Sequence, residues 1–453
     1  MLSRDTLPPG PSNALLQTFN YTRDPYGWLT RMRETYGDVF TVRVVNGTVV
    51  VIGNPSGAQA IFGADPDTFV PFAVDAVRPM MGPNSMLFLT GARHRRERKL
   101  LMPPFHGDRM RAYGEIIRDT ALDVAARWTP GKTMAFQDTS QAISLEVIIR
   151  AVFGIQGSAR VKTVREQIIQ FAKDSNPVLF FFPFLQRSFF GYGPWTRFQR
   201  TKDEIGAMLH AEIETRRLSK EPGADILSLM LAARHEDGSS MSSDELHDEL
   251  LTLLFAGHET TGIALAWAIY WLLRNPDCMA RAMAEIDALG AHPEPDALAR
   301  LPYLDAVVHE TLRLHPIVPD VPRQLARPLE VEGYRLPAGT GIAVATTLLH
   351  TRPDIYPEPE RFRPERFLER KFSPFEYTPF GGGARRCLGA AFATYEMKIV
   401  LGTLLSRYRL VLAEKDEVKP SRRNIVLGPA TGVRVVFIGP RAPQPSATSR
   451  AAA

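Results

Sequence analysis

The sequence predicts a mainly α-helical fold with a small β region, folded as a single domain. Apolar residues recur at spacings of three and four over most of the chain, which places them on one face of a helix. Only one segment, near the start, has the alternation and turn residues of a β-hairpin. No linker, internal repeat or abrupt change of composition divides the chain, so we expect one domain over 1–440.

The composition is that of an ordinary globular protein, with 45% hydrophobic and 23% charged residues. Its 453 residues would ordinarily suggest two or three domains, but they also suffice for one core that encloses a cofactor. The net charge of +5 is too small and too scattered to indicate nucleic-acid binding. Because only two cysteines occur, Cys278 and Cys387, we expect a reducing, cytoplasmic setting rather than a disulfide-stabilised secreted protein.

The hairpin is predicted over Val39–Gly53, where Asn46 and Gly47 join two β-branched runs and both tolerate positive φ. Further strands are expected at Gly341–Thr346 and Val433–Ile438. Apolar spacing predicts helices over Met110–Trp128, Gln141–Phe153, Gln199–Arg217, Ala224–Arg234, Asp277–Ala288 and Pro302–Leu314.

The longest predicted helix covers residues 243–275 and would measure about 50 Å. Ser242 and Glu245 form a capping-box pattern at its start, and a proline stops it. Its apolar stretch, Leu250–Leu273, has the length of a membrane span, but ionisable groups at its centre would be costly in lipid. We therefore expect a buried helix of a soluble protein, and the N-terminus also lacks a stretch suited to a signal peptide or anchor.

Two segments are predicted to lack regular secondary structure. Residues 353–380 are rich in proline and aromatic residues, which favours a packed irregular segment over a flexible linker. Residues 441–453 lack apolar content, so we expect a disordered tail there.

The most informative motif is FGGGARRCLGAAFATYEMK at 380–398, in which Cys387 is followed by an alanine-rich helix. Free N–H groups and the helix dipole at a helix N-terminus favour the thiolate over the thiol. Arg385 and Arg386 act in the same direction, and the three glycines let the backbone approach a flat, bulky group. The alternative is a structural cysteine beside a phosphate-binding turn, although no Lys-Ser/Thr follows as a P-loop requires.

This segment resembles the haem-binding signature of the cytochrome P450 superfamily, the haem-thiolate monooxygenases, of the soluble bacterial type. The five matching residues are Phe380, Gly383, Arg385, Cys387 and Gly389. Such a match arises by chance at about one in several million positions. The resemblance implies haem b (iron protoporphyrin IX) between the long central helix and the helix after the cysteine. Cys387 would be the axial thiolate, Phe380 would pack under the porphyrin, and Gly381 would also contact the haem.

The second candidate site is AGHETT at 256–261, in the middle of the long helix. One face of the helix carries small or hydroxylated residues, which are Ala256, Gly257, Thr260 and Thr261. This face would leave room for a flat cofactor and a diatomic ligand, although a Glu-Thr pair in a helix can also be structural. The resemblance identifies Glu259 and Thr260 as the family's acid–alcohol pair. Thr260 would hydrogen-bond the bound oxygen, and Glu259 would relay protons from solvent.

Glu310 and Arg313 match the Glu-x-x-Arg pair of the same family. The spacing recurs elsewhere in the chain, so it is the helical, apolar context that singles out this pair. Arg366, in the sequence PERF at 364–367, would complete a Glu-Arg-Arg network. The resemblance gives this network a structural role, in which it holds the irregular segment beneath the haem.

The basic segment GARHRRERK at 91–99 places His94 and Arg98 one helical turn apart. A solvated basic helix face is the simplest interpretation. In the family such a His and Arg bind haem propionates, and Arg323 and Arg385 match two further propionate contacts. An acidic electron donor could dock on the remaining cations, which are Arg95, Arg96, Lys99 and Arg109.

The expected substrate contacts are placed by the order of the family's landmarks along the chain. An aromatic patch at 178–185 either packs in the core or forms the apolar lid that the family has over its distal pocket. The full set of expected contacts is Phe72, Val74, Val77, Met80, Phe88, Phe180, Phe181, Ile317 and Val318.

Together these inferences predict a haem-dependent monooxygenase that inserts one oxygen atom from O2 into a lipophilic small molecule, such as a fatty acid, terpenoid or steroid. No flavin or iron–sulfur sequence is fused, so we expect electrons from a ferredoxin, or a flavodoxin, and its reductase. We expect a cytoplasmic monomer with no membrane anchor and no nucleic-acid partner.

Two other functions are weighed. A peroxide-driven haem-thiolate hydroxylase typically has Arg-Pro where this chain has Glu259 and Thr260. A non-catalytic haem-binding sensor would not need an acid–alcohol helix and would normally carry an output domain. This chain fits neither of these two descriptions. The sequence assigns no role to Cys278.

Overall fold

The computed structural model describes residues 7–73, 77–105, 107–175, 179, 185–188, 190–219, 223–423 and 426–441. The chain forms two compact units, and each is described by itself. Unit 1 comprises Met1–Phe72, Ala125–Ser140 and Gly262–Ala453, and unit 2 comprises Ala73–Val124 and Gln141–Thr261. The single domain over 1–440 stays a prediction. Of the tail expected over residues 441–453, only Arg441 is described, and it pairs with Asp287.

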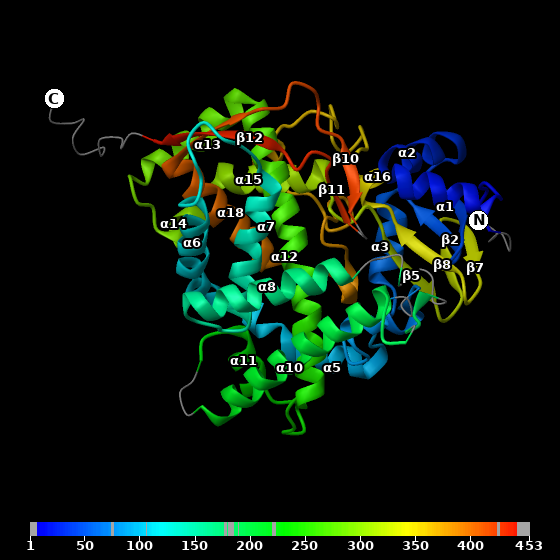
Figure 1. The fold of residues 1–453 in the computed structure, drawn as a ribbon. Coiled ribbons are helices and arrows are strands. Elements are labelled where there is room, and N and C mark those ends of the chain that lie inside the picture. The colour runs from blue at the N-terminus through cyan, green and yellow to red at the C-terminus, as the bar shows by residue number, and fades with distance from the viewer. Residues whose placement is uncertain are drawn as a thin grey trace. The chain divides into compact units, whose positions relative to one another are not determined.

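The mainly α fold with a small β region is confirmed (Figure 1). The helices of unit 1 are α1 (Ala14–Arg23), α2 (Pro25–Tyr36), α3 (Pro55–Gly63), α13 (Pro276–Ala288), α14 (Pro295–Ala299), α15 (Pro302–Leu314), α16 (Thr346–His350), α17 (Arg366–Glu369) and α18 (Ala390–Arg407). Those of unit 2 are α4 (Arg78–Met81), α5 (Gly91–Leu101), α8 (Ser158–Asp174), α10 (Pro194–Leu218) and α11 (Ile226–Ala232). The unit boundaries cut three further helices, which are α6 (Arg111–Ala125), α7 (Phe136–Val147) and α12 (Ser243–Arg274).

The strands of the described residues all lie in unit 1. The largest sheet has the order β1 (Val39–Val44), β2 (Gly47–Ile52), β8 (Gly341–Val344), β5 (Val321–Leu325) and β3 (Phe69–Pro71). Its β2–β8 pair is parallel and the other pairs are antiparallel. The smaller sheets are β4 (Thr133–Ala135) with β12 (Arg434–Pro440) and β9 (Tyr408–Leu412), β6 (Leu329–Val331) with β7 (Tyr334–Leu336), and β10 (Pro420–Arg423) with β11 (Val426–Pro429).

Strand β2 is buried on both faces, which explains its unbroken run of β-branched residues. Val50 and Ile52 point to the face covered by α3, where Phe62 joins the same cluster. Val49 and Val51 point to the opposite face, which α2 covers (Figure 1). The sheet therefore has a packed apolar cluster on each face, and it presents β5 and α3 to the loop before α18.

The predicted hairpin is confirmed, but its turn lies one residue earlier than expected. Val44 pairs with Gly47, so Val45 and Asn46 form the two-residue loop. Gly47 is the first residue of β2 and has a φ of +135°. The left-handed conformation is thus needed only at the glycine, where the missing Cβ makes it inexpensive.

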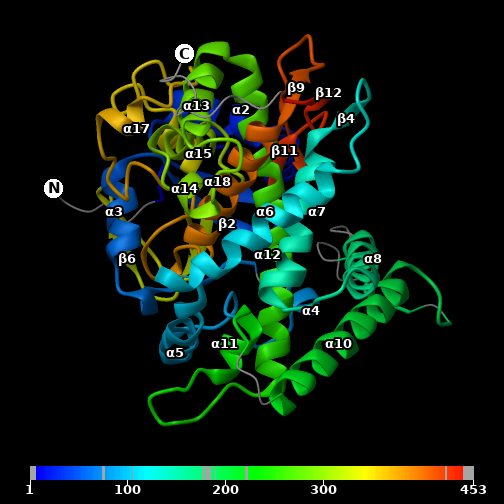
Figure 2. The same cartoon turned by 90° about the vertical axis from the view of Figure 1, so that its left-hand side faces the viewer.

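The predicted helices are confirmed with small differences at their ends. α15 begins and ends as expected, and the capping box of α12 is present, since the Ser242 N–H donates to Glu245 Oε2 at 2.9 Å. α7 stops at Val147 because the next five residues form a π-helix, Ile148–Val152. In unit 2, α8 lies along α10 (Figure 2), and Phe171 of α8 stacks on Phe198 of α10 at 5.9 Å between ring centroids.

Candidate active site

Cys387 lies on an exposed loop between the short 3-10 turn Gly383–Arg385 and α18. Its backbone N–H donates to the carbonyl oxygen of Phe380 at 2.9 Å, which closes the loop across seven residues of sequence. α18 begins at Ala390 and has Gly389 as its N-cap, so the thiol precedes the first helical turn. The loop thus holds the cysteine at the helix N-terminus with its side chain open to solvent.

The glycines before Cys387 pack against α3. A Cβ on Gly382 would lie 2.3 Å from Cδ2 of Phe62, and one on Gly383 would lie 2.4 Å from the Phe62 carbonyl oxygen. Gly383 also has a φ of +65°. We expected these glycines to admit a flat, bulky group, and at Gly382 and Gly383 the group in contact is the protein's own Phe62.

Gly382→Ala is expected to destabilise the protein by about 1–3 kcal/mol, because the added methyl group would overlap a buried ring. Gly389→Ala is the matched control, since a Cβ at that position would meet no described atom within 4 Å outside its chain neighbours and its own helix backbone. Urea unfolding of both variants, with the haem content per chain, measures the difference. Equal stability of the two variants would show that the loop does not depend on its contact with Phe62.

Arg323 of β5 is a buried cation beside this loop. Its Nη2 donates to the carbonyl oxygen of Gly382 at 2.7 Å, and its guanidinium lies over the rings of Phe62 and Phe69. Its Nε is buried and has no hydrogen-bond partner in the part of the chain that the structure describes. Burial, together with the nearby charge of Arg385, lowers the pKa of Arg323 to about 10. A buried donor without an acceptor is costly, so the site is suited to an anionic group.

The middle of α12 is more open than the residues on either side. Ala256 is exposed, and Thr260, partly exposed, donates from Oγ1 to the Ala256 carbonyl oxygen at 2.7 Å. Such side-chain bonds to the preceding turn often bend helices. Thr261 is buried, and a Cβ on Gly257 would lie 2.7 Å from Cδ1 of Ile148. The four small residues therefore differ in exposure, since Thr261 is buried, while Gly257 is partly exposed and packs closely against Ile148.

The next two residues of α12, His258 and Glu259, are both partly exposed but differ in charge. His258 Nδ1 lies 2.8 Å from the Leu254 carbonyl oxygen, and burial lowers the pKa of His258. This histidine is therefore a neutral donor to its own helix. Glu259 is the acidic residue of this segment, and it is partly exposed to solvent.

Glu310 of α15 is the centre of a fully buried charge network. Its Oε1 accepts from Arg313 Nη2 at 2.8 Å and from Arg366 Nε at 3.0 Å, and its Oε2 accepts from Arg313 Nε at 2.7 Å. Arg313 and Arg366 also donate to carbonyl oxygens of the irregular segment, at Pro359 and Pro357. The network joins α15 to the segment before the cysteine loop.

His350, which we did not single out in the sequence, extends this network to the cysteine loop. Its Nδ1 lies 3.1 Å from the Arg313 carbonyl oxygen, and its Nε2 accepts from the Thr378 N–H at 2.9 Å. The Thr378 carbonyl oxygen accepts in turn from the Gly381 N–H at 3.0 Å. Burial and the charge of Arg313 lower the pKa of His350 to about 3, so the ring stays neutral and keeps this bonding pattern. A lone histidine in an apolar run was its only sequence signal.

The family profile of cytochrome P450 matches residues 6–435. The chain belongs to the cytochrome P450 family. It is 36% identical over 456 residues to a Mycobacterium tuberculosis protein named as cytochrome P450 135B1, an alignment that covers 99% of this chain and 94% of the relative. It is 34% identical to the M. tuberculosis protein named as cytochrome P450 138, over 90% of this chain and 91% of that one.

The solved structure of retinoic acid-bound cyanobacterial CYP120A1 superposes with a TM-score of 0.84 at 26% identity. The alignment covers 95% of this chain and 99% of that one, so the cytochrome P450 fold extends over nearly the whole protein. Members of the family are monooxygenases whose haem is held by a cysteine thiolate. This chain is therefore a haem-dependent monooxygenase.

The residues of unit 1 fit the haem of a cytochrome P450. An exposed cysteine on a closed loop is available to the iron, and the unsatisfied Nε of Arg323 on the neighbouring strand is a suitable donor for a propionate carboxylate. Haem supplies the activation of molecular oxygen when it is bound. The residues of the chain must hold it, exclude water and move protons.

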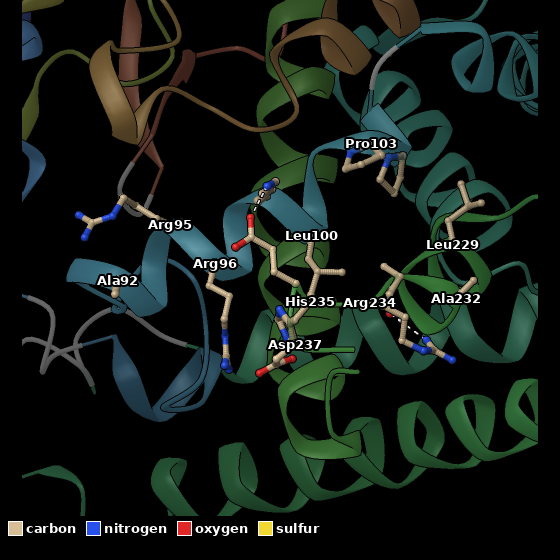
Figure 3. A pocket seen from close by; sticks show the side chains of 14 residues that line it. Ala92, Arg95, Arg96, Leu100, Pro103, Leu229, Ala232, Arg234, His235 and Asp237 are labelled. Carbon is tan, nitrogen blue, oxygen red and sulfur yellow. Dashed lines mark hydrogen bonds and ion pairs between the residues drawn. The ribbon is translucent and has the colours of Figure 1, made fainter. Parts of the chain in front are cut away.

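The basic segment of the cytochrome P450 forms α5, and its residues differ in burial. His94 is buried and Arg98 is partly exposed. Arg96 and Lys99 line a cavity of about 760 Å³ that the end of α11 and the chain after it complete (Figure 3). Lys99 Nζ pairs across it with Glu236 Oε1 at 2.5 Å, and both side chains are exposed. Arg109, the last of the expected docking cations, has no described side chain.

The expected substrate contacts fall on several segments. Phe72 packs against the core of the largest sheet, which gives it a structural role as well. Phe88 is buried, with the Arg78 guanidinium 5.4 Å from its ring centroid, and Val77 and Met80 are partly exposed. Two further expected contacts differ in exposure, since Ile317 is buried and Val318 is exposed. Val74, Phe180 and Phe181 lie outside the described residues.

No helix in the described part of the chain has an apolar stretch long enough to cross a membrane. This finding includes α12, which contains the long apolar segment of the sequence.

Proposed function

We propose that this cytochrome P450 hydroxylates a lipophilic small molecule, with haem b held by the Cys387 thiolate. The single observation that carries the proposal is the juxtaposition of the exposed Cys387 loop and the buried Arg323, whose Nε lacks an acceptor. Together they offer one ligand for an iron and one donor for a carboxylate. A haem carries both an iron and propionate carboxylates on one molecule.

The second cysteine supports this assignment by contrast. Cys278 is half-buried on α13, and its thiol shares a hydrogen bond with Tyr303. Burial raises the pKa of Cys278, which favours the thiol over the thiolate. Of the two cysteines, only Cys387 combines exposure with a helix N-terminus and adjacent arginines.

The remaining site roles follow from the same assignment. Arg323 and Arg385, with His94 and Arg98, would bind the propionates, and Phe380 and Gly381 would contact the porphyrin. On α12, Ala256 and Gly257 would contact the cofactor from the helix. Thr260 would hold a proton at its hydroxyl, and the partly exposed Glu259 would supply that proton from solvent.

A lipophilic substrate is supported by the apolar character of the expected contacts, among which Val77 and Met80 retain partial exposure. The cyanobacterial relative was solved with retinoic acid, a long apolar molecule with one carboxylate. Fatty acids, terpenoids and steroids share its largely apolar skeleton.

We further propose that separate proteins supply the electrons, either a ferredoxin or a flavodoxin, with a reductase. Exposed cations on α5, Arg95, Arg96 and Lys99, would attract an acidic donor. A cytoplasmic monomer remains our prediction from the sequence.

Product coupling in the reconstituted enzyme tests this proposal. With donor proteins and a lipophilic substrate that shifts the haem spin state, the wild type should form product in proportion to the reductant consumed. Thr260→Ala should keep its haem and consume reductant, yet divert at least about half of the electrons to hydrogen peroxide, because the hydroxyl that orients protons is absent. Thr260→Ser should restore coupling. Product formation only with added peroxide would instead establish the peroxide-driven alternative.

A further inference from the structure

We propose that Asp248 and Glu249 are positioning residues, which hold the loop 82–86 and thereby the substrate-contact segment that runs from Val77 to Phe88. This inference rests on the proposed function only for the role of that segment in substrate binding. The attachment of the loop to α12 is independent of it, because every contact used lies within unit 2.

The loop follows α4 (Arg78–Met81) and donates hydrogen bonds to two carboxyl groups of α12. Asp248 Oδ2 accepts from the Asn84 N–H at 2.8 Å and from its Nδ2 at 3.0 Å. Glu249 Oε1 accepts from the Met86 N–H at 2.6 Å. Since buried backbone donors must find acceptors, the carboxyl groups of these two side chains replace the pairing that a helix or strand would supply.

Two further contacts show that the loop is closely fitted to this part of α12. Thr252, one turn after Asp248, donates to Ser85 Oγ at 2.7 Å, and both residues are buried. Gly82 has a φ of +83°, and a Cβ there would lie 2.1 Å from Asp248 Oδ1. The loop can approach the carboxylate only because this residue is glycine.

Charge makes the attachment sensitive to pH. Glu249 is 2% exposed, and Glu97 of α5 and Asp248 face it with like charge, while Arg93 of α5 opposes them. Two histidines lie at the edge of this cluster, His235 at 3.8 Å from Glu97 and His247 at 3.0 Å from Asp248. Burial, with the like charges, raises the pKa of Glu249 to about 8.

The raised pKa of Glu249 determines how the stability of the folded protein changes with pH. A carboxyl group with a raised pKa in the folded protein stabilises it fully below its unfolded pKa, and this contribution is lost as pH rises through about 8. Above that pH the ionised Glu249 is buried beside Glu97 and Asp248, and these costs exceed the gain from a stronger Met86 hydrogen bond, so the loop 82–86 should loosen.

Hydrogen exchange of amides 82–90 in the haem-loaded enzyme tests the attachment at pH 7 and pH 9, after correction for intrinsic exchange. Wild-type protection should fall about tenfold at the higher pH, and Glu249→Ala should be weakly protected at both. Glu249→Gln keeps an acceptor but cannot ionise, so its protection should not change with pH. Asp244→Asn is the matched control on the same helix, since that side chain is exposed.

Spin-state titration with a lipophilic ligand tests the positioning role. Glu249→Ala should raise the dissociation constant about tenfold, with the carbon-monoxide spectrum unchanged. Exchange in Glu249→Ala that matches wild type at both pH values would overturn the attachment. A pH response retained in Glu249→Gln would overturn the assignment of that response to Glu249. Loss of protection with unaltered ligand affinity would overturn the positioning role. A missing thiolate-type spectrum in the wild type would contradict the proposed function instead, and would leave the exchange result valid.

Discussion

Cys387→Ser is expected to abolish both hydroxylation and the red-shifted Soret band of the reduced, carbon-monoxide-bound protein. A serine hydroxyl cannot supply the electron density that a thiolate donates to iron, so activity should fall by several orders of magnitude. The Cys387 side chain is exposed on a loop closed by a backbone hydrogen bond to Phe380. The substitution should therefore leave the fold intact, and circular dichroism should match the wild type.

Cys278→Ser is the matched control for this prediction. That thiol is half-buried beside Tyr303 on α13, and its replacement should keep the spectrum and the activity. If the red-shifted band persisted in Cys387→Ser and disappeared in Cys278→Ser, the two assignments would have to be exchanged. If both variants kept the band, neither cysteine would be the ligand.

Glu310→Gln is expected to lower the free energy of unfolding by about 3–5 kcal/mol. Glu310 is fully buried, and its carboxylate compensates two buried guanidinium groups, those of Arg313 and Arg366. The amide that replaces it is neutral and presents donors toward donors, so two cations would remain in a low-dielectric site without a counter-charge. Haem content should fall with stability, because the network leads through His350 to the cysteine loop.

Glu358→Gln makes the same chemical change in an ion pair that is exposed to solvent. Glu358 pairs with Arg361 at the same spacing of three residues, but both side chains are more than half exposed. Such a surface pair contributes about 0–1 kcal/mol, so urea unfolding should separate the two variants clearly. Similar losses in both would contradict a specific role for the buried network.

Local patterns predicted secondary structure well where burial is one-sided. α15 has the expected ends because its apolar residues follow a helical spacing and prolines flank it. The helix α8 was not predicted. Its buried residues Val161, Val164 and Ile168 do have the three- and four-residue spacing of a helix face, so the sequence carries the signal. Most of the short strands were missed because strands of three to five residues offer too few alternations for a pattern to be seen.

The cysteine motif and the two arginine partners of Glu310 were recognisable from sequence, because these residues stand at fixed spacings or in a distinctive local context. Burial was not recognisable in the same way. The family resemblance singled out Arg323, but only the fold showed that β5 places its Nε in the interior beside Gly382. The contact between Gly382 and Phe62 joins residues more than three hundred positions apart, so no local pattern could reveal it.

The sequence by itself determined the fold class, the family and the identity of the cysteine motif, since these depend on periodicity and on residue spacing along the chain. Tertiary structure alone decided which charged groups are buried and what they face. Arg323 without an acceptor, His350 between Arg313 and Thr378, and Glu249 beside two other acids owe their properties to neighbours distant in sequence. The cost of burying a charge depends on those neighbours and on exclusion of water, and both exist only in the folded chain.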